Sequence, residues 1–247
     1  MYTVMDLYDA LVGAAGLLAG ALASIVGFGI GSLLTPVLAL ETGTKVAVAA
    51  VSIPHFIGTA VRFVQLSGHV DRRVFIRFGV MSAAGGLTGA LLHARAPAGT
   101  LSVVFGALLI GVAISEFTGY AQRLRFEGPL AWIAGGLSGL LGGLVGNQGG
   151  IRSGALVGFH LTRDAFVATA TAIGLLVDAA RMPVYFVTER EAVMAIWPSV
   201  LVATAGVVIG TLVGRRVLSR IPETWFHRIV AIVLFVLGTA MVVRGVR

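Results

Sequence analysis

GNQGGIRSGA, residues 146–155, places Arg152 among glycines inside an apolar part of the chain. Residues 128–151 contain no charged side chain, and the sequence stays mostly apolar to residue 159. A second glycine-rich stretch, GFGIGSLLTP at residues 27–36, lies within a run of 31 uncharged residues, 10–40. Closely spaced glycines weaken a helix and let other groups approach the backbone. These two stretches decide the predicted fold.

The composition indicates an integral membrane protein. Of the 247 residues, 57% are hydrophobic and 12% are charged, and the mean hydropathy is +0.96. A soluble domain carries about 25% charged residues, so part of this surface must face lipid. The net charge is +7, but the basic residues lie in short gaps between apolar runs, where they face lipid headgroups. We therefore expect membrane lipid as a partner and no nucleic acid. The absence of cysteine excludes disulfides and thiolate sites.

The first apolar run is too long for one straight helix. Thirty-one residues, 10–40, extend about 46 Å as a helix, against a hydrocarbon core of about 30 Å. Gly27, Gly29, Gly31 and Pro36 predict a break, with Pro36 disfavouring helix just before it. We expect apolar segments at 7–27, 31–41, 45–66, 73–93, 99–119, 128–145, 150–160, 164–186, 192–214 and 224–244. The prediction is an all-α, multi-pass membrane protein without a separate soluble domain.

The two halves of the chain match at an offset of 119 residues. This offset places Gly27 on Gly146 and Arg62 on Arg181. We predict a first membrane repeat at 1–122 and a second at 123–247, which together form one transmembrane domain. Each repeat contains a broken or re-entrant helix and three or so transmembrane helices. Duplication with glycine-interrupted segments at equivalent positions is typical of secondary transporters and indicates where the substrate binds.

The direction of the repeats depends on whether the broken segments cross the membrane. If they are re-entrant, each half crosses three times, the repeats are inverted, and nine basic residues face five across the membrane. If they cross, the repeats are parallel and the basic residues divide eight against six. We favour inverted repeats. The other glycines, such as Gly85 and Gly210, fit close helix packing.

Each break leaves a helix N-terminus with unpaired N–H groups and a positive dipole end, which favours anions. Arg152 would lie in the first turn of the second new helix, where a cation is unfavourable unless an anion is near. The predicted anion site comprises Arg152, Asn147, Gln148, Gly149, Gly150, Gly29 and Gly31, with Ser52 and Thr171 at its walls. The alternatives are that Arg152 snorkels to an interface or caps a broken helix, and that Asn147 and Gln148 only satisfy the backbone.

Other charged residues allow two interpretations each. Arg62 and Arg181 support the site from behind or act as its gate, or they snorkel to an interface. Asp178 pairs with Arg181 at i, i+3, or it couples protons. His55 is a satisfied core histidine, or it couples protons. No metal-ligand spacing, nucleophile motif or phosphate loop is present, so we expect no metal, no cofactor and no enzymatic activity.

The stretch GFGIGSLLTP resembles the glycine-rich motif of the sulfite exporter TauE/SafE family, also called the toluene-sulfonate uptake permease family. Gly27, Gly29, Gly31 and Pro36 match it, whereas the second copy has Asn147, Gln148 and Arg152 among its glycines and Ala155 where proline would fall. The resemblance implies a cytoplasmic-membrane secondary transporter of sulfite, sulfonates or related organosulfur oxyanions. Alternatives are an anion channel of the same fold, a transporter of small carboxylates and a non-transporting membrane partner. A homodimer is left open.

Overall fold

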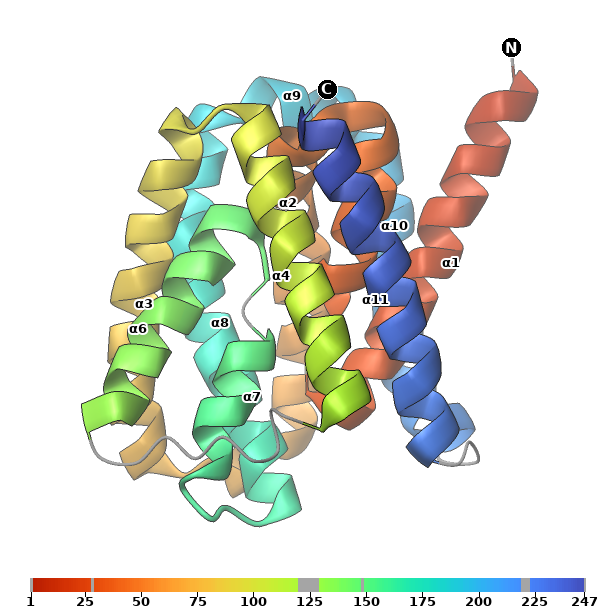
Figure 1. The fold of residues 1–247 in the computed structure, drawn as a ribbon. Helices are drawn as coiled ribbons and strands as arrows, with labels where there is room; N and C mark the ends of the chain where they lie inside the picture. Colours follow the sequence, from red (N-terminus) through yellow and green to blue (C-terminus); the bar gives the residue numbers. More distant parts are fainter. Residues whose placement is uncertain (1, 28, 120–128, 148, 219–222, 247) are drawn as a thin grey trace.

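The protein is an all-α bundle of long helices (Figure 1). The structure is a computed structural model that describes residues 2–27, 29–119, 129–147, 149–218 and 223–246. Among these residues there is no strand, and seven helices are long and apolar enough to span a bilayer. The helices are α1 (Tyr2–Val26), α2 (Ile30–Leu66), η1 (Ser67–His69), α3 (Arg72–Arg95), α4 (Ala98–Thr118), α6 (Pro129–Val145), α7 (Gly149–Val157), α8 (Arg163–Thr188), α9 (Arg190–Ala195), α10 (Trp197–Leu218) and α11 (Glu223–Val246). The prediction of an all-α membrane protein is confirmed.

The first predicted break is present, and the chain reverses there. Gly27 and Gly29 have φ values of 84° and 127°, which only glycine adopts readily, and the helix resumes at Ile30. The hydroxyl of Tyr8 donates to the carbonyl of Leu38 at 3.1 Å, so the first part of α2 folds back along α1. Gly43, with φ 75° and ψ 160°, then interrupts α2 between the two predicted segments, 31–41 and 45–66. The first segment of α2, from Ile30 to Gly43, therefore runs antiparallel to α1.

The second break divides α6 from α7 at Gly146, whose φ is 74°. In Figure 1 the α1–α2 hairpin opens toward the end of the bundle with both termini, and the α6–α7 hairpin opens toward the other end. The inverted interpretation predicts this arrangement. That the halves are copies stays a prediction, and its boundary at residue 122 lies outside the described residues.

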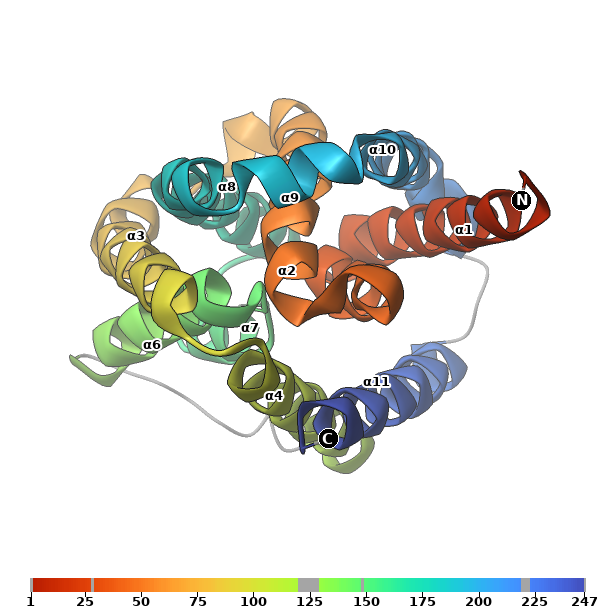
Figure 2. The ribbon, with the colours of Figure 1, turned by 90° about the horizontal axis from the view of Figure 1, so that it is seen from above.

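The long helices pack in pairs, and each pair joins a helix from the first half of the chain to a helix from the second half. Helix α1 packs on α10, α3 packs on α6, and α4 packs on α11 (Figure 2). In the first two pairs, glycines let the two helices approach each other closely. A Cβ added at Gly20 of α1 would lie 2.2 Å from the carbonyl oxygen of Val207 on α10. A Cβ at Gly143 would lie 1.9 Å from that of Gly86. Gly85 and Gly210 likewise face backbone atoms of the neighbouring helix, so they serve close helix packing, as predicted.

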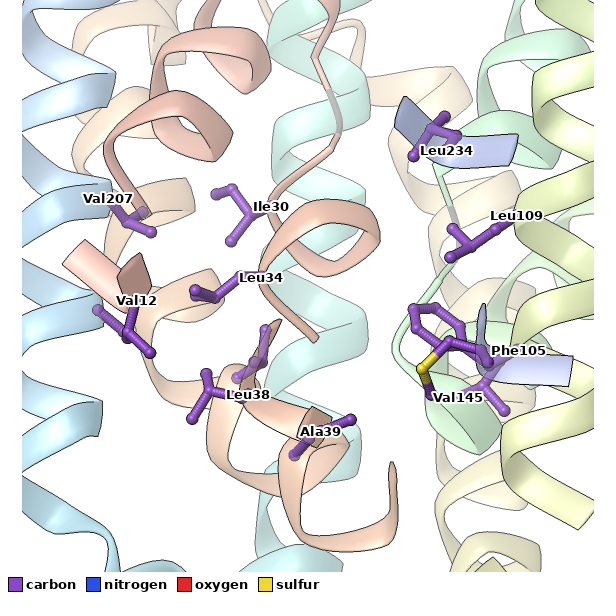
Figure 3. Close-up of a cluster of buried hydrophobic side chains, with 14 of the residues drawn as sticks. Val12, Ile30, Leu34, Leu38, Ala39, Phe105, Leu109, Val145, Val207 and Leu234 are labelled. Atoms are coloured by element: carbon purple, nitrogen blue, oxygen red, sulfur yellow. The ribbon is translucent and has the colours of Figure 1, made fainter. Parts of the chain in front are cut away.

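An apolar core surrounds the first segment of α2. Ile30, Leu34 and Leu38 lie on one face of this segment and are at most 1% exposed. They belong to one buried cluster with Val12 of α1 and Val207 of α10 (Figure 3). This packing holds the start of α2 deep in the bundle.

Two predicted details are wrong. Pro36 lies inside α2, within the predicted segment 31–41, but the helix also runs through the residues just before it, which this proline was expected to disfavour. A membrane helix tolerates the lost hydrogen bond when its neighbours satisfy the freed carbonyl. The predicted segment 192–214 is two helices, α9 and α10, that meet at Ile196. Pro198 explains the division, since it has no N–H to donate and fits the first turn of α10.

Candidate functional site

The two breaks touch each other in the interior of the bundle. A Cβ added at Gly31, at the start of α2, would lie 2.3 Å from the carbonyl oxygen of Gly146, at the end of α6. Only a residue without a side chain allows this contact. The two chain reversals are therefore in direct backbone contact.

A small polar cavity lies beside this contact. Its volume is about 10 Å³, which is room for about one water molecule. It is lined from both breaks and from the helices that follow them: Gly27, Gly29, Gly31, Ser32, His55, Thr59, Arg62, Gly146, Asn147, Gly149, Arg152 and Gly174. The broken helices thus enclose a polar space within an apolar bundle, the setting in which irregular backbone survives at membrane depth.

The C-terminal end of α1 is capped by an arginine. Arg62 is 4% exposed, and its Nη1 donates to the carbonyl of Ala23 at 2.7 Å. Its Nη2 donates to the carbonyl of Gly27 at 3.3 Å, and its Nε donates to the hydroxyl of Thr171 at 2.9 Å. The carbonyl of Ala23 also accepts from the backbone N–H of Gly27 at 3.0 Å, so the cation adds a second donor there and supplies a donor to the carbonyl of Gly27. It lies at the negative end of the helix dipole.

The C-terminal end of α6 is capped in the same way, by three side chains. Arg181 Nη1 donates to the carbonyl of Gly142 at 2.6 Å, and residue 142 is the offset-119 partner of residue 23. The hydroxyl of Tyr185 donates to the carbonyl of Gly143, and Nδ1 of His93 lies 2.8 Å from the carbonyl of Leu144. Arg181 is 1% exposed. Snorkelling of Arg62 and Arg181 to an interface is therefore wrong.

Arg152 is the arginine that the protein leaves partly unsatisfied. It lies in the first turn of α7, as predicted, and is 4% exposed, so it does not snorkel either. Its Nη1 donates to the carbonyl of Ala170 on α8 at 2.8 Å rather than capping a broken helix. Its Nε and Nη2 are buried without a hydrogen-bond partner among the described residues, as is Nδ2 of Asn147. Both side chains line the cavity.

The start of α2 adds further donors. Gly29 precedes the helix without a side-chain cap, and Gly29, Gly31 and Ser32 line the cavity. The N–H groups of a first helical turn have no helical partner, and they lie at the positive end of the dipole. The negative helix ends at the breaks are thus capped by protein, while a positive end and Arg152 border the cavity.

Asp178 connects His55 to Arg181. Its Oδ1 accepts from Arg181 Nε at 2.9 Å and lies 2.8 Å from Nη2, which confirms the predicted i, i+3 pair. Its Oδ2 lies 2.6 Å from Nδ1 of His55, a contact that sequence reasoning missed. His55 lines the cavity, whereas Asp178 and Arg181 lie behind it.

Some predicted site residues lie elsewhere. Ser52 lines a second, apolar cavity of about 200 Å³ beneath α9, and its hydroxyl donates to the carbonyl of Ala49. Thr171 contacts Arg62 but is not among the residues lining the polar cavity. Gly150 lies in the first turn of α7, and Gln148 lies outside the described residues.

Five residues that line the cavity were not predicted as site residues: Gly27 and Gly146, which sequence reasoning placed only in the breaks, and Ser32, Thr59 and Gly174. The match between the two halves could have indicated two of them, because the offset of 119 residues pairs position 59 with 178 and position 55 with 174. Thr59 and Gly174 are thus the offset partners of Asp178 and His55.

Comparison with protein families agrees with this architecture. Residues 12–241 match the model of the family described as Sulfite exporter TauE/SafE. The chain belongs to this family. A search of curated proteins and a search of solved structures each found no significant match.

Membership in the TauE/SafE family settles the class of the protein. It is a membrane transporter of sulfur anions such as sulfite, and it is not an enzyme. The family membership that the motif at residues 27–36 indicated is confirmed, and the match to the family model covers nearly the whole chain.

Proposed function

We propose that the polar cavity between the two breaks is the substrate site of a secondary transporter in the cytoplasmic membrane, and that it binds sulfite or a related sulfur oxyanion. One observation carries the proposal: Nε and Nη2 of Arg152 are buried beside the cavity without a described protein partner. An unpaired buried charge is costly, so its presence indicates an anionic guest. A guanidinium offers two parallel donors to an oxyanion.

The charge balance around the cavity supports an anion. Among the described residues, the buried charged groups are Arg62, Arg152, Arg181 and one carboxylate, Asp178. Asp178 is paired with Arg181, and Arg62 is engaged with the carbonyls of α1. Arg152 has one carbonyl partner, Ala170, and no carboxylate, so a negative guest would balance its charge.

The small cavity favours a carrier over a channel. Space for about one water molecule, with Gly31 against the carbonyl of Gly146, is too little for a sulfite ion to pass. Binding would require the two hairpins to separate slightly. Opening to one side and then to the other is alternating access at the interface of two broken helices.

Replacing Arg152 by methionine tests the proposal. We expect Arg152→Met to weaken sulfite binding by about 10- to 100-fold, because a hydrogen bond to a charged group contributes about 1.5–3 kcal/mol. We expect sulfite exchange in vesicles to stop. The free energy of unfolding should not fall, since the variant removes a buried cation whose Nε and Nη2 have no hydrogen-bond partner among the described residues.

Arg62→Met is the matched control. Arg62 is equally buried, but its hydrogen bonds are satisfied by Ala23, Gly27 and Thr171. We expect its loss to lower the melting temperature, since it removes three buried hydrogen bonds and leaves the carbonyl of Gly27 without this donor. Normal sulfite exchange by Arg152→Met, or a larger fall in its melting temperature than in that of Arg62→Met, would contradict the proposed role of Arg152.

A further inference from the structure

His55 and Asp178 form a buried pair whose geometry fixes the tautomer of the histidine. Oδ1 of the Asp178 carboxylate already accepts a hydrogen bond from Nε of Arg181 and lies 2.8 Å from its Nη2. The other oxygen, Oδ2, lies 2.6 Å from Nδ1 of His55. An ionised carboxylate can only accept, so the proton of this hydrogen bond belongs to Nδ1. In the neutral ring the second nitrogen, Nε2, then carries a lone pair and can accept a proton.

The histidine is open to the cavity while its partner is sealed. His55 lines the cavity and 11% of its side chain is exposed, whereas the side chain of Asp178 is 0% exposed. The charged groups facing it are Asp178 and Arg181 from α8, Arg152 from α7, and Arg62, which shares its helix and lines the same cavity. Three of these groups are cations and one is an anion.

This surplus of cations makes protonation depend on the guest. An imidazolium in the empty cavity would add a fourth cation to three arginines that share one carboxylate. An anion beside Arg152 lowers this surplus of positive charge and favours the added proton. By linkage, the proton must strengthen anion binding by the same factor.

We propose that His55 is the proton-binding site of the transporter, that Asp178 holds it in the tautomer that accepts a proton at Nε2, and that the proton is taken up together with the anion. The proton comes from water, forms the second N–H bond of the ring, and returns to water when the anion leaves. The inference rests on the proposed anion site and adds the coupled ion. The transporter would then move protons and anions in the same direction.

Calorimetry of the whole protein in detergent tests this coupling. The probe is thiosulfate, which keeps two negative charges through the range of about pH 5 to 8 in which histidine titrates. Titrations in two buffers with different ionisation enthalpies give the number of protons taken up per anion. We expect uptake of up to one proton, and affinity that rises as the pH falls, by at most about tenfold per pH unit.

His55→Gln should bind thiosulfate without proton uptake and with an affinity that no longer depends on pH. His69→Gln, which changes an exposed histidine at the end of η1, should behave like the wild type. If His55→Gln does not fold, the wild-type titrations still decide, together with ¹⁵N NMR of the imidazoles with and without thiosulfate. One ring should gain a proton at Nε2 when thiosulfate is added.

The outcomes separate the two proposals. Thiosulfate binding without proton uptake by the wild type would overturn the role of His55 and leave the anion site standing. Equal uptake by His55→Gln and the wild type would also overturn it, because the proton would bind elsewhere. Failure of both thiosulfate and sulfite to bind the wild type would overturn the anion site and, with it, this inference.

Discussion

At the scale of single residues, Arg62 and Arg181 show how a charge can be structural inside a membrane. Each follows its break by 35 residues, counted from Gly27 and Gly146, and each donates to the last turn of its broken helix. Their equivalence could be predicted from the offset of 119. Their capping role could not, because the carbonyls lie 39 residues away in the chain for both arginines. Arg152 has no basic counterpart, since its offset partner is Leu33.

Asn147 offers a second test of the cavity at this scale. Its Nδ2 is buried without a partner among the described residues and lines the cavity with Arg152. We expect Asn147→Asp to weaken sulfite binding at least about tenfold, because like charges brought together cost several kcal/mol. The new carboxylate would pair with Arg152, so the melting temperature without sulfite should not fall. The measurement is the thermal shift with sulfite.

Asn147→Ser is the matched neutral control, because it keeps a polar group at the same position without adding charge. It should retain most of the binding. Equal affinity of Asn147→Asp and the wild type would exclude Asn147 from contact with the anion.

At the scale of elements, the glycines of the breaks allow the chain to reverse, whereas those of the helix pairs allow close packing. Glycine spacing in the sequence predicts the breaks, and the structure confirms them at Gly27, Gly29 and Gly146 through positive φ values. The interruption at Gly43 also agrees with the predicted segments. Sequence reasoning could not show that Gly31 meets Gly146, since this contact joins halves that lie more than a hundred residues apart.

Gly31→Ala tests whether the contact of the breaks matters. The added Cβ would lie 2.3 Å from the carbonyl oxygen of Gly146, so one break must move. We expect a loss of about 1–3 kcal/mol in the free energy of unfolding, as in other overpacked cores, and a loss of sulfite binding. Chemical unfolding and the sulfite thermal shift measure the two effects.

Gly111→Ala is the control for this variant, because a Cβ at Gly111 of α4 meets no described atom within 4 Å. It should bind sulfite normally and gain up to about 1 kcal/mol of helix stability. If Gly31→Ala and Gly111→Ala behaved alike, the contact between the breaks would have no role in binding.

At the scale of the whole molecule, two hairpins from opposite ends of the bundle meet around one cavity (Figure 1). Composition and the uncharged runs are enough to predict the helical membrane fold, because lipid requires every backbone group to be satisfied within helices. Ser52, which we expected at the walls of the site, does not line the polar cavity. Ser52 precedes His55 by three residues, or about 4.5 Å along α2, and lines the other cavity. Spacing along the chain does not show which residues of a helix line which cavity.

Anomalous diffraction from crystals grown with selenite, the heavier counterpart of sulfite, tests the central claim most directly. We predict a selenium peak between Arg152, Asn147 and the start of α2 at Gly29–Gly31, and no peak there in crystals of Arg152→Met. Selenium bound only at the surface, with the wild-type cavity empty at concentrations that saturate transport, would contradict the account.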